Sequence, residues 1–95
     1  MLDPIKGLPT AVRTKEDALQ AAQELVQNAW AARGAIVAID RNVAGGAERM
    51  RKLMRVLDMR SGAALGAIAA YFRSGLLDAQ AYNLLSAEVR RILTP

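Results

Sequence analysis

Apolar residues recur every three or four positions along most of this chain, and that spacing restricts its fold more than any other feature. Between Thr14 and Gly34, the residues that follow the helical period are Ala18, Leu19, Ala22, Leu25, Val26, Ala29 and Trp30. The residues that fall on the opposite side are Glu16, Gln20, Gln23, Glu24 and Gln27. Because an α-helix turns once in about 3.6 residues, this spacing predicts an amphipathic helix, and its alanines would let a partner helix approach closely.

Capping residues and glycines mark the expected ends of the helices. Thr14 is expected to begin the first helix in a capping box with Asp17, and Gly34 to end it. The segment from Ala35 to Ala44 is predicted to be a short helix that ends at the following glycine pair. Two alternatives stay open: a short strand at Ile36–Ile39, which contains β-branched residues, and a continuous helix through Gly34, at about 1 kcal/mol relative to alanine.

The second half of the chain is predicted to contain three more helices. Two lie between residues 47 and 73 and are separated by a break at Ser61-Gly62, and the last begins at the cap residue Asp78. Aromatic residues are only 4% of the chain, so the apolar content comes from small and aliphatic side chains. We therefore predict an all-α fold, a small bundle of four to five short helices around one core.

An extended N-terminal arm at residues 1–13 is expected in front of a single helical domain at residues 14–95. Pro4 and Pro9 each bias the preceding residue away from the helical conformation, which favours an extended chain. The arm is nevertheless apolar at Leu2, Ile5 and Leu8. We expect these side chains to pack on the bundle or on a neighbouring subunit.

The absence of cysteine and histidine excludes most familiar catalytic mechanisms. Without them there is no disulfide, no thiolate nucleophile, no imidazole base and none of the usual zinc ligands. The carboxylates are dispersed, so no catalytic pair is nominated and we expect neither an enzyme nor a bound cofactor or metal. The N-terminus lacks the pattern of a secretory signal, and the longest uncharged stretch is shorter than the roughly 20 residues that span a bilayer. A cytoplasmic protein without membrane contact is therefore expected.

A group of positive residues within one predicted helix is the candidate for nucleic-acid contact. These residues are Arg49, Arg51, Lys52, Arg55 and Arg60. Helical spacing scatters them over much of the solvent-facing side, and Glu48 and Asp58 stand where they can pair with Lys52 and Arg55. The net charge of +4 is also modest, so a solvated helix surface is the favoured interpretation.

Two glycine motifs have ordinary structural explanations. Gly62 and Gly66 are four residues apart, as in membrane helix dimers, but the apolar segment is too short and a close helix crossing within the protein is predicted instead. The glycine pair Gly45-Gly46 lacks the lysine and hydroxyl residue of a phosphate loop, and it is interpreted as a turn.

Apolar residues outside the predicted core faces indicate an interface. The candidate interface residues are Leu2, Ile5, Leu8, Val56, Met59 and Leu84. They favour a non-catalytic protein-interaction or assembly module that forms a homo-oligomer. The alternative is a small nucleic-acid-binding protein that uses the positive helix. A third hypothesis is a small-ligand binder or enzyme with an apolar pocket between helices.

Overall fold

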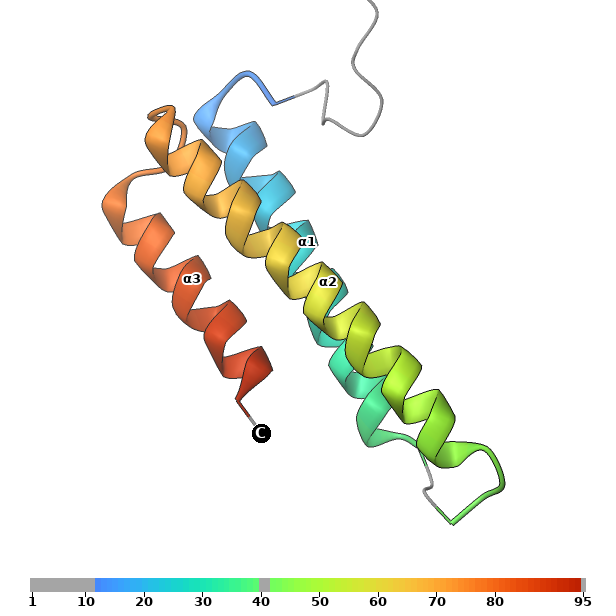
Figure 1. The fold of residues 1–95 in the computed structure, drawn as a ribbon. Coiled ribbons are helices and arrows are strands. Elements are labelled where there is room, and N and C mark those ends of the chain that lie inside the picture. The colour runs from blue at the N-terminus through green and yellow to red at the C-terminus, as the bar shows by residue number, and fades with distance from the viewer. Residues whose placement is uncertain (1–11, 40–41, 95) are drawn as a thin grey trace, which may run out of the picture.

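The structure, a computed structural model, describes residues 12–39 and 42–94, and these form three α-helices (Figure 1). The helices are α1 (Lys15–Val37), α2 (Gly46–Arg73) and α3 (Ala79–Leu93). No strand occurs among the described residues. The all-α prediction is confirmed, whereas the prediction of four to five helices is wrong, because two expected breaks lie inside continuous helices.

The first of these breaks was expected at Gly34, which instead lies within α1. Ala29 and Ala32 are buried before it, and Ile36 is half-buried after it on the same side of the helix. Contact on both sides of the glycine offsets its cost of about 1 kcal/mol. The separate helix at 35–44 and the alternative strand are therefore both wrong: α1 ends at Val37, and residues 42–45 form a turn.

The second expected break, at Ser61-Gly62, lies near the middle of the 28-residue helix α2. Ser61 is 1% exposed and shares the inner side of α2 with Ala64 and Ile68, which are completely buried. A helix that ended at Ser61 would have removed this small side chain from the buried side of α2. Packing thus outweighs the weak helix preference of serine and glycine.

Both predicted N-terminal caps are present. The Thr14 hydroxyl accepts a hydrogen bond of 3.1 Å from the Asp17 N–H, and the Asp17 carboxylate accepts one of 3.3 Å from the Thr14 N–H. The N–H of Arg13 and the groups of Thr14 bond to this carboxylate and lower the pKa of Asp17. At α3, the Asp78 side chain accepts a hydrogen bond of 2.7 Å from the Ala81 N–H. Capping was readable from the sequence because it depends on residues three positions apart.

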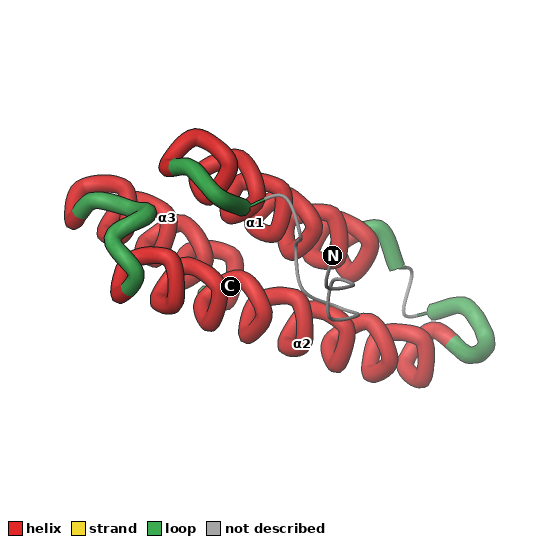
Figure 2. The backbone as a smooth tube through the Cα atoms, turned by 90° about the horizontal axis from the view of Figure 1, so that it is seen from above, coloured by secondary structure: helices red, strands yellow, loops and turns green. Residues whose placement is uncertain are grey.

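The helices α1 and α2 form an antiparallel hairpin, and α3 packs on both of them (Figure 2). Buried and half-buried residues recur along α1 and the following turn, spaced alternately by four and three positions: Ala18, Ala22, Leu25, Ala29, Ala32, Ile36 and Ile39. The α2 residues with the same spacing are Met50, Met54, Leu57, Ser61, Ala64, Ile68 and Tyr71. This is the heptad spacing of helices that pack as a coiled coil.

The core lies where all three helices meet. It is formed by Ala18, Ala22, Val26, Ala29, Ala64, Ile68, Leu77, Val89 and Ile92. The side chains of α1 and α2 in this set are mostly small, which allows the helices to approach closely. Of the predicted arm, Val12 and Arg13 are described, and Val12 packs against the core. The predicted interface residues Leu2, Ile5 and Leu8 lie outside the described residues.

The close crossing predicted at Gly62 and Gly66 is wrong. Both glycines are exposed, and a Cβ atom built on either one would have no neighbour within 4 Å. The inner side of α2 is formed instead by Ser61, Ala64 and Ile68. The small-residue side of α2 therefore faces outward.

Candidate interaction surface at the end of the hairpin

The α1–α2 hairpin extends well beyond the last turn of α3 (Figure 1). Arg33 of α1 lies at the end of α3, where it contacts the carbonyl groups of Arg91 and Ile92. The contact of Arg60 with Asn28 shows which parts of α1 and α2 lie side by side. We define the hairpin end as residues 34–39 and 42–56, which lie beyond this level, and the three-helix half as the rest of the described chain.

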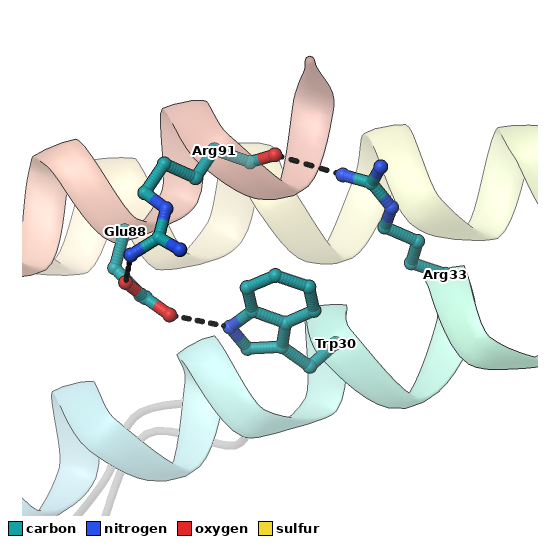
Figure 3. A network of polar contacts seen from close by, with 4 residues as sticks. All are labelled: Trp30, Arg33, Glu88 and Arg91. Carbon is teal, nitrogen blue, oxygen red and sulfur yellow. Dashed lines mark hydrogen bonds and ion pairs between the residues drawn. The ribbon is translucent and has the colours of Figure 1, made fainter. Parts of the chain in front are cut away.

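The position of Arg33 is part of a polar network that sequence reasoning missed (Figure 3). Nη1 of Arg33 lies 2.8, 2.6 and 2.8 Å from the carbonyl oxygens of Arg91, Ile92 and Thr94. Carbonyl groups at the C-terminus of a helix have no partner within the helix itself. The guanidinium of Arg33 therefore caps the negative C-terminal end of α3. The sequence offered no local signal, because Arg33 and Ile92 are 59 positions apart.

Trp30 joins the same two helices one turn earlier (Figure 3). Its indole N–H donates a hydrogen bond of 2.9 Å to Glu88, and Arg91 pairs with the other oxygen of Glu88 at 3.4 Å. The Arg33 guanidinium lies 5.8 Å from the centre of the Trp30 ring. Together these contacts hold the end of α3 against α1.

At the hairpin end no apolar side chain is buried; Gly46 is the one buried residue there. Among the large apolar residues of the hairpin end, the most exposed are Val37 at 77%, Val43 at 60% and Met54 at 51%. Half-buried apolar residues surround them: Ile36, Ile39, Met50, Leu53 and Val56. Two helices contact each other along one side only, so without a third helix the remaining apolar surface stays in water. Ala47 and Met54 are exposed for this reason.

Positive side chains of α2 stand beside this apolar surface. Arg49, Arg51, Lys52 and Arg55 are all exposed. Arg51, Lys52 and Arg55, with Glu48, line a shallow hollow of about 240 Å³. The expected pair of Glu48 and Lys52 is present at 4.0 Å, whereas Asp58 forms no ion pair with Arg55 among the described residues. The positive group predicted from sequence is thus largely available to a partner.

Arg60, the fifth residue of the predicted nucleic-acid set, has a structural role. Its guanidinium donates a hydrogen bond of 2.9 Å to the backbone carbonyl of Asn28 in α1. It therefore links the two helices of the hairpin. The other four positive residues of the set all lie in the first half of α2.

An open apolar hollow of about 520 Å³ lies between the two helices at the hairpin end. Its lining is formed by Ala35, Ala38, Ile39, Val43, Ala44, Gly46, Arg49 and Leu53. Arg49 is the one charged residue among the described residues of this lining. A small-ligand site would need several convergent polar groups, and the described part of this open surface supplies a single charged one.

The predicted interface residues that the structure describes lie on two helices, Val56 and Met59 three positions apart on α2, and Leu84 on α3. Val56 is half-buried, Met59 on α2 is 70% exposed, and Leu84 on α3 is 65% exposed. Leu84 lies with Leu19 in a shallow groove of about 320 Å³ between α1 and α3. Helical periodicity identified Met59 and Leu84 as outside the core, but it did not place them in one patch.

The described residues contain neither a membrane-spanning helix nor a group of residues that could hold a metal ion. No described helix is long and apolar enough to cross a membrane. Within residues 12–39 and 42–94, no three acidic side chains gather where they could hold a metal ion. Comparison with protein-family models, curated proteins and solved structures finds no match for this chain.

Proposed function

We propose that this chain is a non-catalytic helical protein-interaction module that assembles with copies of itself. One observation carries the proposal: large apolar side chains remain exposed after the core is complete. Met59 and Leu84 are more than 60% exposed, although both stand on well-formed helices. Exposed large apolar side chains that adjoin further uncharged surface are typical of sites where another protein binds, and Met59 adjoins such a surface on α2.

The outer side of α2 is the surface that we assign to self-association. Residues 61–72 carry no charge, and Gly62, Ala63, Gly66 and Ala70 are exposed along this stretch. Small side chains would let a second α2 approach closely. Met59 stands at one end of this surface and supplies a large apolar contact.

An antiparallel arrangement of the two copies suits the distribution of charge. The cations of α2 are concentrated between Arg49 and Arg60, and between there and the end of the helix only Arg73 is charged. If two α2 helices cross near Gly66 in opposite directions, their positive halves lie at opposite ends of the dimer. Such a pair is related by a two-fold axis, the commonest symmetry of small assemblies.

Sedimentation of the full chain over a range of concentrations tests this proposal. We expect the wild-type protein to shift from monomer to dimer, and the double variant Val56→Glu, Met59→Lys to remain monomeric, because charges buried without partners oppose association. The control Gln20→Lys, Gln27→Glu makes matching charge changes at exposed positions of α1 and should dimerise like the wild type. A wild-type chain that stays monomeric at millimolar concentration would contradict self-association.

Nucleic-acid binding is the second candidate, and the exposed row of Arg51, Lys52 and Arg55 favours it. If it holds, Arg51→Ala with Arg55→Ala should weaken binding and reduce the salt slope by about one phosphate contact for each residue removed. We rank it lower because Arg60 bonds within the protein and Glu48 interrupts the positive row. Sub-micromolar binding of DNA or RNA at physiological salt by a monomeric chain would reverse this order.

A further inference from the structure

The hairpin end combines an uncovered apolar surface with an excess of positive charge. In the three-helix half, α3 lies on the face formed by α1 and α2. The heptad residues of α2 continue into the hairpin end at Met54 and Met50. The face that α3 occupies is therefore prolonged past its last residue. It has no covering helix among the described residues.

We propose that the hairpin end binds an acidic amphipathic helix of a partner protein, placed on the hairpin in line with α3. The uncovered part of α2 runs from Gly46 to Val56, a length of about 16 Å at 1.5 Å per residue. A helix of about three turns matches it. Its apolar side would cover Val37 and Met54 and so complete the three-helix packing that α3 provides elsewhere.

The charge of the hairpin end selects an acidic partner. The described residues of the hairpin end contain four cations and one carboxylate, and Arg51 and Arg55 are exposed one helical turn apart, three positions before and one position after Met54. Carboxylates along the edge of the bound helix would neutralise these guanidinium groups. A second copy of this chain would bring the same positive charge to the same surface, so self-association is disfavoured here.

The apolar surface distinguishes this partner from a nucleic acid. A phosphate backbone would contact Arg51, Lys52 and Arg55 but would leave Val37 and Met54 in water. The inference goes beyond self-association through the outer side of α2, because it assigns a different surface and a different partner. Either proposal can therefore fail without the other.

Titration of the full chain with three synthetic helical peptides tests this inference. Each peptide has about 16 residues: the first has leucines at heptad spacing flanked by glutamates, the second replaces the glutamates with lysine, and the third replaces the leucines with glutamine. We expect the first to bind roughly tenfold more tightly than either of the others, and its affinity to fall with salt. Equal binding of the first and second peptides would overturn the proposal.

Variants of the chain locate the binding site. We expect Met54→Gln to weaken binding of the acidic peptide about fivefold, and Arg51→Gln with Arg55→Gln to weaken it about as much while flattening its salt dependence. The control Lys15→Gln with Arg73→Gln removes two cations at the opposite end of the molecule and should leave binding unchanged. Circular dichroism of each variant checks that the helices are retained.

Two results of the variant series would also overturn the inference. One is a loss of peptide affinity in the control that equals the loss in the Arg51 and Arg55 variant. The other is tighter binding of a single-stranded RNA than of the acidic peptide, unaffected by Met54→Gln, which would assign the positive surface to nucleic acid.

Discussion

The two halves of the α1–α2 hairpin share one spacing of inward residues but differ in how far those residues are buried. In the three-helix half, Ala22, Ala64 and Ile68 are completely buried. At the hairpin end, the larger side chains of Ile36, Met50 and Met54 remain partly or mostly exposed. Side-chain size does not explain this difference, because Ile68 is completely buried whereas Ile36, the same type of residue, is only half-buried. The presence of α3 explains it, since full burial needs neighbours on more than one side.

The largest expected effect is a difference in stability loss between two truncations of a side chain, one in each half. We expect Ile68→Ala to reduce the free energy of unfolding by about 2–5 kcal/mol, because it leaves a cavity in the core. Met54→Ala at the hairpin end should reduce it by about 1 kcal/mol or less, because that side chain is already 51% exposed. Denaturant unfolding of both variants measures the difference, and equal losses would refute the comparison.

A smaller effect is expected where the two halves meet. Arg33→Met keeps much of the aliphatic stem but removes the hydrogen bonds to the end of α3, and we expect a loss of about 1–3 kcal/mol. Amide exchange at residues 89–93 should accelerate as α3 separates from α1. The control Arg73→Met changes an exposed arginine in the last turn of α2 and should have a smaller effect. Unchanged exchange in the Arg33 variant would show that α3 is held by its apolar side alone.

Substitutions of two glycines test the backbone of the hairpin end: Gly34 lies inside α1, and Gly45 lies in the turn before α2. Gly34 is inside the helix with open space around a Cβ atom, so Gly34→Ala should stabilise the protein by about 0.5–1 kcal/mol. Gly45 has a φ of +80°, so Gly45→Ala should destabilise it by about 1 kcal/mol. Thermal unfolding of both variants shows whether the melting temperature rises for the first and falls for the second. Destabilisation by Gly34→Ala would mean that the helix ends there after all.

The smallest expected effect depends on pH and belongs to the three-helix half. Hydrogen bonds from Arg13 and Thr14 lower the pKa of Asp17, so this group stabilises the fold above its unfolded pKa of about 4 and loses that effect as pH falls through its folded value. Asp17→Asn should therefore lower the melting temperature near neutral pH, and the difference should shrink in acid. Thr14→Ser keeps the capping hydroxyl and serves as the control. A difference that is constant with pH would exclude the carboxylate as its source.

The candidate site residues were only partly recognisable before the fold was known. The positive residues at positions 49–55 and the surplus apolar residues Met59 and Leu84 could be identified from helical spacing. The sequence pattern did not show that Met54 would be exposed, because it shares the heptad spacing of the buried Ser61 and Ala64. Nor did it show that Arg60 and Arg33 bond to distant carbonyl groups.

The sequence by itself determined the helical class, the two capped helix starts and the apolar side of each helix. Each of these depends on residues within one or two turns of each other, and local chain geometry is sufficient to decide them. Only the tertiary structure decided that the helices continue through Gly34 and Ser61-Gly62, that the small-residue side of α2 faces outward, and that α3 covers only part of the hairpin. Those features arise from contacts between helices, whose free energy exceeds the local cost of a glycine or serine.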